Sequence, residues 1–190
     1  MTRILLTAFE PYDRWKENSS WLALIDLTSW YDGDMELVTR RYPVDLAVMR
    51  ERLQADLSQG FDTVIHLGQS PGASVIQLES TGLNTRSDGT ALQVDGPVAY
   101  RSNCDLHACH QRLADSGIPS KISHHAGTFL CNATLYLSQH YSAMTGGRSQ
   151  CLFVHLPLSP AQVAADGSAL PSMSIPMQSA AIALIAQALQ

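Results

Sequence analysis

The chain has 190 residues, a formal net charge of −5 and no block of lysine or arginine, which argues against nucleic acid as its main partner. Its length is typical of one domain with a real hydrophobic core, and no apolar stretch approaches the length of a membrane span. We expect no signal peptide, because Glu10 and Pro11 end the first apolar run too early. The four cysteines are too few for a disulfide scaffold, so we expect reduced thiols in a cytoplasmic protein.

Apolar runs typical of β-strands alternate with helical patterns along the whole chain. In the first half we predict a strand at Arg3–Phe9, a helix from Asn18 or Ser19 to about Leu27, a strand at Glu36–Tyr42, a helix capped by Asp45 that ends at Gly60, a strand at Thr63–Leu67 stopped by Gly68, and a strand at Val75–Leu83. In the second half we predict a loop at Asn84–Asn103, a helix at Asp105–Ser116 stopped by Gly117, a short strand at Ile122–His124, a helix with Cys131 in its first turn, a strand at Cys151–His155, a loop at Leu156–Met173, and a helix at Ser174–Gln190.

This alternation predicts an α/β fold. We expect a three-layer α/β/α single domain over residues 1–190, with a largely parallel, mixed central sheet between two helix layers. The two predicted loops are rich in Gly, Pro, Ser and Asp, and long loops in such folds often cover a site.

Cys131 follows a small-residue turn and lies in the first turn of an apolar-periodic helix. A helix start presents unpaired N–H groups and the positive end of the helix dipole, and both favour a thiolate over a thiol. Because a thiolate is the nucleophile of cysteine catalysis, Cys131 is the first candidate for chemistry.

A cysteine nucleophile needs a base, and the base needs an orienting group. His155 ends a predicted strand, and ligands of open α/β sheets bind beyond the carboxyl ends of strands. The alternative is a histidine that only closes the strand. Glu79 lies in a run suited to a buried strand, where a carboxylate needs a partner such as a protonated imidazole. The alternative is a strand-end glutamate that faces solvent.

Other candidates rank lower. His124 and His125 precede the cysteine helix and are rival bases, but catalytic partners usually meet through the fold and not along the chain. Four residues could suggest a metal site: Cys104, His107, Cys109 and His110. Their spacing matches no common zinc pattern, and a helix scatters them over its faces, so we predict no metal. Cys151 opens a core strand and is expected to be an inert apolar residue.

Aromatic side chains mark a candidate binding pocket. Phe9 and Tyr12 follow the end of the first strand, on the same edge as His155 if the sheet is parallel there. Their rings could sandwich a small flat ligand, or they could be core aromatics under a loop. Gln69 follows a third strand end, and its amide could bind another amide or cap a turn.

Seven segments, in order along nearly the whole chain, carry a further pattern. They are Ile4–Tyr12, Asn18–Ser20, His66–Gln69, Leu78-Glu79 with Asn84, Asp95–Tyr100, Ala126–Asn132, and Val154–Pro157 with Pro160 and Gln162. Together they resemble the motifs of pyroglutamyl-peptidase I, the pyrrolidone-carboxylate peptidases, including the G-F-E-P-F opening, the H-x-G-Q strand end and the A-G-T-[YF]-[VL]-C-N segment. Members of that family are cytosolic cysteine peptidases that remove an N-terminal pyroglutamate from peptides.

The resemblance implies a triad in which Cys131 is the nucleophile, His155 the base and then the acid, and Glu79 the orienting carboxylate. It also implies a set of substrate-binding residues: Phe9, Tyr12, Phe129 and Leu130 as walls of the pyroglutamate pocket, and Asn18 and Gln69 as polar contacts. The implied reaction is acyl transfer through a thioester, without metal or organic cofactor, and the family is commonly tetrameric.

The chain departs from the family pattern at the rim of the pocket. Ala8 replaces a glycine, Asp13-Arg14 a glycine pair, and Ser80 a basic residue, while Thr85–Gly89 shortens a D-A-R-x-P-D-N run. These changes spare the implied triad, so we expect them to affect substrate breadth and rate more than reaction type. The alternatives are a cysteine amidohydrolase acting on another lactam or small amide, and a low-activity binding protein on the same scaffold.

Overall fold

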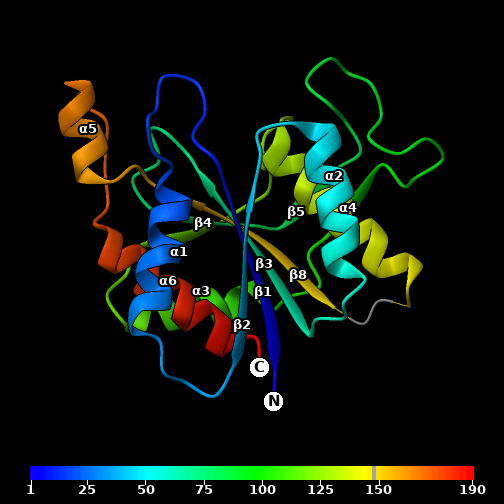
Figure 1. The fold of residues 1–190 in the computed structure, drawn as a ribbon, viewed down its shortest axis with the longest axis horizontal. Helices are drawn as coiled ribbons and strands as arrows, with labels where there is room; N and C mark the ends of the chain where they lie inside the picture. Colours follow the sequence, from blue (N-terminus) through cyan, green and yellow to red (C-terminus); the bar gives the residue numbers. More distant parts are fainter. Residues whose placement is uncertain (147–148) are drawn as a thin grey trace.

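A six-stranded sheet forms the centre of the computed structural model, which describes residues 1–146 and 149–190 (Figure 1). In spatial order its strands are β2 (Glu36–Tyr42), β1 (Arg3–Phe9), β3 (Thr63–Gln69), β8 (Gln150–Leu156), β4 (Ile76–Glu79) and β7 (Ser120–Ser123). The first four run parallel, β4 runs antiparallel to β8, and β7 runs parallel to β4. The largely parallel, mixed sheet predicted from the sequence is therefore confirmed.

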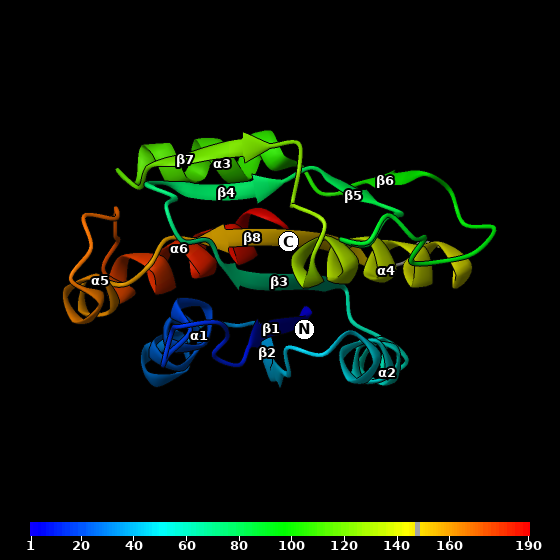
Figure 2. The ribbon, with the colours of Figure 1, turned by 90° about the horizontal axis from the view of Figure 1, so that it is seen from above.

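Helices cover both faces of this sheet, as the alternating pattern predicts (Figure 2). On one side lie α1 (Ser19–Trp30), α3 (Leu106–Asp115) and α6 (Ile175–Ala188), and on the other lie α2 (Leu46–Leu57) and α4 (Leu130–Met144). The short α5 (Pro160–Asp166) lies apart from both layers. None of the helices in the described residues has the length and apolar character needed to cross a bilayer.

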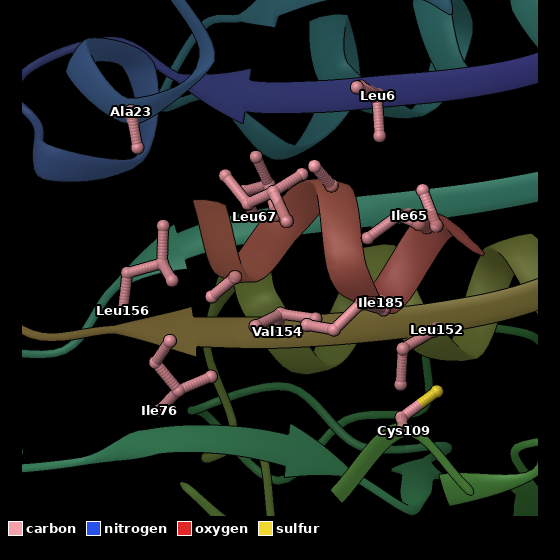
Figure 3. Packing of buried hydrophobic residues seen from close by; sticks show 14 of the residues in the cluster. Leu6, Ala23, Ile65, Leu67, Ile76, Cys109, Leu152, Val154, Leu156 and Ile185 are labelled. Carbon is pink, nitrogen blue, oxygen red and sulfur yellow. The ribbon is translucent and has the colours of Figure 1, made fainter. Parts of the chain in front are cut away.

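Each face of the sheet has its own hydrophobic core, because successive strand side chains point to opposite faces. On the side of α1, α3 and α6, the core includes Leu6, Leu67, Val154 and Ile185 (Figure 3). On the side of α2 and α4, residues such as Phe9, Tyr136 and Phe153 form the second core. The two cores hold the sheet between the helix layers, and the carboxyl ends of β1, β3 and β8 carry Phe9, Gln69 and His155.

The predicted strand Val75–Leu83 is wrong as a single element. The chain leaves the central sheet at Ser80, and the next residues form β5 (Thr81–Leu83), which pairs with β6 (Ala99–Arg101) in a separate two-stranded sheet. Gly82 permits this departure: a Cβ at this position would lie 2.8 Å from the backbone nitrogen of Tyr136 in α4. The glycine therefore lets β5 pack directly against the helix that carries Cys131.

Two predicted loops contain regular structure. Asn84–Asn103 includes β6, and Leu156–Met173 includes α5. A capping box begins α5: the Ser159 hydroxyl accepts a hydrogen bond from the backbone of Gln162, and the Gln162 side chain accepts one from the backbone of Ser159. The Ser-Pro-x-Gln spacing is a known start signal that could have indicated this helix.

Several element boundaries also differ from the prediction by a few residues. Gly68 does not stop its strand, because β3 stays paired with β8 as far as Gln69. The first helix continues to Trp30 instead of ending near Leu27. The short strand predicted at Ile122–His124 lies at Ser120–Ser123, where its backbone pairs with β4. Such differences of a few residues reflect tertiary pairing, which local patterns do not encode.

A buried histidine in the middle of the sheet predicts a pH dependence of stability. His66 is fully buried, shares a hydrogen bond of 2.7 Å with the Thr7 hydroxyl, and burial lowers its pKa from 6.5 to about 3. Below about pH 6.5, His66 is therefore protonated in the unfolded chain, whereas in the folded chain it stays neutral down to about pH 3. Stability should fall over this window as pH decreases, by up to about 1.4 kcal/mol per pH unit.

We expect the substitution His66→Gln to flatten this slope between pH 6.5 and 4, measured as the free energy of unfolding in urea. The matched control is His107→Gln, since His107 is exposed. Equal pH slopes in the wild type and in both variants would contradict the interpretation.

Candidate active site

Cys131 lies in the first turn of α4, as predicted, and it is partly exposed. The residue before the helix, Phe129, makes no side-chain capping bond, so among the described residues no side chain caps the first N–H groups of α4. Gly127 has a φ of 81°, which lets the chain turn sharply into the helix. The sulfur therefore lies beside unpaired backbone donors and the positive end of the helix dipole.

His155 and Glu79 form a buried pair, although 76 residues separate them in sequence. The imidazole Nδ1 lies 2.7 Å from Glu79 Oε1, and the Glu79 side chain has no solvent exposure. The antiparallel pairing of β4 with β8 makes this contact, because it sets Gln77 opposite His155 and Glu79 opposite Phe153. The structure thus favours the interpretation of Glu79 as a buried, paired carboxylate over that of a solvent-facing one.

The charge state of His155 follows from its neighbours. Burial by itself lowers the pKa of this imidazole, but the nearby Cys131 sulfur and the Glu79 carboxylate, which is hydrogen-bonded to it, raise it to about 10. Since Nδ1 is held by Glu79, the other ring nitrogen, Nε2, is the one available to Cys131. At neutral pH His155 is therefore an imidazolium next to the Cys131 sulfur, and a cation beside a cysteine favours the reactive state of a nucleophile.

A small cavity of about 160 Å³ opens beside the sulfur. Its lining consists of Phe9, Tyr12, Asn18, Val44, Gly68, Gln69, Phe129, Leu130 and Cys131, most of it apolar. All the substrate-binding candidates from the sequence therefore meet at one cavity. Val44 and Gly68 were not among the sequence candidates. Gly68 belongs to the H-x-G-Q segment but has no functional group, and no motif pointed to Val44.

The polar side chains of the cavity wall also brace the fold. Asn18 caps α1 through its oxygen, which accepts hydrogen bonds from the backbone and hydroxyl of Ser20, and its amide donates to the backbone oxygen of Glu10. Gln69 Oε1 accepts hydrogen bonds from the backbone of Ser19 at 2.8 Å and from Gln162 at 2.7 Å. These bonds fix the segment between β1 and α1, which carries Tyr12.

The Tyr12 hydroxyl lies inside this wall. It donates a hydrogen bond of 3.3 Å to the backbone oxygen of Gln69. Burial, together with the nearby charge of Cys131, raises the pKa of Tyr12 to about 12, so the phenol stays neutral and remains a donor. The ring thus presents an apolar face to the cavity while its polar end is satisfied by the protein.

The lower-ranked candidates lie elsewhere. His124 Nδ1 is 2.7 Å from the Ser80 hydroxyl, and His125 Nδ1 accepts a bond from the backbone of Gly127, so neither ring is paired with Cys131 in the described hydrogen bonds. Cys109 lies on α3 and is buried in the core, and the described residues contain no group of three or more His, Cys, Asp or Glu side chains arranged to hold a metal.

Comparisons with known proteins point to one family over nearly the full length of this chain. The family model described as pyroglutamyl peptidase matches residues 2–190. The pyrrolidone-carboxylate peptidase of Pseudomonas fluorescens is 36% identical over 190 residues, covering 92% of this chain and 86% of that protein. That of Clavibacter michiganensis is 33% identical, covering 99% of this chain and 92% of that protein.

Solved structures of pyrrolidone carboxyl peptidases have the same fold as this chain. The pyrrolidone carboxyl peptidase of Fervidobacterium islandicum superposes with a TM-score of 0.92 at 32% identity, covering 98% of this chain and 97% of that chain. The enzyme of Thermococcus litoralis gives a TM-score of 0.91 at 29% identity, covering 100% of this chain and 93% of that chain.

The environment of the four cysteines predicts selective alkylation. Cys104, Cys109 and Cys151 are buried, and burial raises their pKa values to about 12, 12 and 11, whereas Cys131 is partly exposed beside an imidazolium. We expect one equivalent of iodoacetamide at pH 7 to modify Cys131 alone in the folded protein, as measured by peptide mass mapping. Comparable modification of the buried thiols under native conditions would argue against this environment.

Proposed function

Since the chain belongs to the pyroglutamyl peptidase family, we propose that Cys131, His155 and Glu79 are the catalytic triad of this enzyme. The chain is a cysteine exopeptidase that removes an N-terminal pyroglutamate from peptides. The observation that carries the assignment of the triad is the buried Glu79–His155 pair, with 2.7 Å between Oε1 and Nδ1, and the Cys131 sulfur near the same imidazole. The alternative of a low-activity binding protein gives no reason to keep a buried carboxylate, an imidazolium and a thiolate together.

The first half of the reaction forms a thioester. The Cys131 thiolate attacks the carbonyl carbon that joins pyroglutamate to the next residue, and the carbonyl oxygen becomes an oxyanion. The uncapped N–H groups at the start of α4 lie where they can stabilise that charge. The His155 imidazolium then gives its Nε2 proton to the leaving amine as the C–N bond breaks, which leaves the acyl group on sulfur and a neutral imidazole.

The second half regenerates the thiolate. Neutral His155 accepts a proton from water while the water oxygen attacks the thioester, and collapse of the intermediate expels the Cys131 sulfur. Pyroglutamate leaves, and the thiolate–imidazolium pair is restored. Glu79 holds the imidazole by Nδ1 throughout and stabilises its cationic form. Apart from the substrate and one water molecule, every step proposed here uses only side chains and backbone groups of this chain.

The cavity explains why the pyroglutamyl group is preferred. We propose that the ring of the substrate binds between Phe9, Tyr12, Phe129 and Leu130, with Asn18 and Gln69 at the polar part of the wall. Pyroglutamate is a lactam without a charged amine, so it can enter an apolar cavity of about 160 Å³ at low cost. An ordinary N-terminal residue would bring an ammonium group with no carboxylate in the cavity lining to pair with it.

We also propose that residues 1–190 form a single catalytic domain that works as a homotetramer in the cytoplasm. Packing of α1 against α6 joins the two ends of the chain in one core, which supports a single domain. All four cysteines are free thiols, as suits a reducing compartment. The tetramer rests on the family resemblance, and sedimentation of the purified protein measures it directly.

The first test is hydrolysis of a pyroglutamyl-coumarin amide under reducing conditions. We expect turnover of this substrate only, with no release from alanyl- or prolyl-coumarin amides, because an ammonium group is excluded from the cavity. The substitution Cys131→Ala should reduce kcat on the order of 10⁴-fold or more while the fold remains intact by circular dichroism. Faster turnover of another lactam or small amide than of the pyroglutamyl substrate would instead support the alternative, a cysteine amidohydrolase.

The second test concerns Glu79. Because the Glu79 carboxylate raises the pKa of His155, which stands at about 10, the substitution Glu79→Gln should lower it. The imidazolium is the acid of the reaction, so the alkaline limb of kcat/KM should move to lower pH, and kcat should fall by about 10²- to 10⁴-fold. The control Glu51→Gln removes one exposed carboxylate from α2 and should leave the profile in place. An unmoved alkaline limb in Glu79→Gln would count against the proposed role.

A further inference from the structure

We propose that Gly68 is a positioning residue for the nucleophile: its missing side chain leaves a socket in the sheet in which the Cys131 sulfur sits. This inference rests on the proposed catalytic role of Cys131 and concerns a residue that has no functional group of its own. Gly68 lies on β3 in register with His155 on β8, and it lines the substrate cavity. It is therefore next to the base, the nucleophile and the space for the substrate.

Space, and not backbone conformation, explains a glycine at this position. Gly68 lies within a paired strand, where any residue can adopt the backbone geometry, and it is not among the residues with positive φ. A Cβ built on it would lie 3.1 Å from Cys131 Sγ and 2.7 and 2.8 Å from two ring carbons of Phe153. Both kinds of contact are closer than ordinary packing allows.

The aromatic side of the socket is held firmly. Phe153 has no solvent exposure, and its ring packs against Phe9 and His66, with centroid distances of 6.4 and 6.3 Å. The closest ring is that of His155, at 4.9 Å. A methyl group that displaced Phe153 would therefore press on the catalytic imidazole.

The helix above the socket is also fixed. Asn132, the residue after the nucleophile, is fully buried, and its side chain makes hydrogen bonds of 2.8 to 3.0 Å to backbone atoms of Leu83 and Thr85. The start of α4 is thus tied to β5 and cannot easily lift from the sheet. The remaining adjustment available to a methyl group at position 68 is rotation of the Cys131 side chain away from His155.

Such a rotation has two measurable consequences. A displacement of about 1 Å in a reacting atom typically costs on the order of 10²-fold in rate, so kcat should fall by that order. In addition, the Cys131 thiolate is one of the groups that raise the pKa of His155, so moving the sulfur away should lower that pKa. A purely structural glycine would affect stability without this second effect.

The test compares Gly68→Ala with Leu67→Ala, the neighbouring position on β3, whose side chain faces the opposite core. For Gly68→Ala we expect kcat about 10²-fold lower, an alkaline limb of kcat/KM at lower pH, and slower alkylation of Cys131 by iodoacetamide at pH 7. Leu67→Ala should lose thermal stability with an unchanged alkaline limb. The inference would be overturned if Gly68→Ala kept the wild-type kcat, the wild-type pH profile of kcat/KM and the wild-type rate of Cys131 alkylation.

If overpacking against Phe153 prevents the Gly68→Ala variant from folding, the same substitution is tested in a Phe153→Leu protein. The substitution Phe153→Leu removes the ring atoms that a methyl group at position 68 would meet, so Gly68→Ala is compared within that background. The inference requires that Gly68→Ala still lowers kcat in the Phe153→Leu protein and still moves the alkaline limb of its kcat/KM profile to lower pH. The absence of both effects refutes the inference. Wild-type protein without pyroglutamyl hydrolysis would defeat the proposed function instead, while the alkylation rates would still report on the socket.

Discussion

The contact between Glu79 and His155 is the constraint on which the rest of the site depends. A carboxylate without solvent exposure is costly unless a cation pairs with it, and here an imidazolium 2.7 Å away supplies that charge. The pair exists only because β4 runs antiparallel to β8 inside an otherwise mostly parallel sheet. The same pair holds the imidazole by Nδ1, which leaves Nε2 as the nitrogen available to Cys131. The reversal of strand direction therefore orients the base and, together with the nearby Cys131, favours its charged form.

The nucleophile reaches this base from a different element. Cys131 belongs to the first turn of α4, where backbone donors are open, and the helix is tied to β5 by Asn132. Strand β5 can take that place because the chain leaves the central sheet at Ser80 and because Gly82 permits close contact with α4. The sulfur and the imidazole are thus brought together by two neighbouring segments of the chain, β4 and β5, that belong to different sheets.

The substrate cavity depends on polar bonds that lie behind its walls. Tyr12 is held by the backbone oxygen of Gln69, while the Gln69 side chain is held by Ser19 and by Gln162 from α5. Helix α5 therefore supports the cavity although it contributes no residue to its lining. A cavity wall fixed in this way keeps its apolar surface exposed to the ligand without collapsing, which is the preorganisation that small-molecule sites require.

The sequence by itself determined most helices and strands, the placement of Cys131 at a helix start, and the set of motifs that resemble one family, since these depend on local periodicity, capping residues and spacing. It left His155 and Glu79 each with a plain structural alternative, because no local pattern states which strand ends meet. Tertiary structure decided that β4 runs antiparallel to β8, that the predicted strand Val75–Leu83 divides at Ser80, and that Gly68 lies within its strand beneath the sulfur. The physical reason is that strand order, register and the close approach of backbones are set by packing between residues far apart in the chain, whereas the sequence pattern records only how each segment buries its own apolar face.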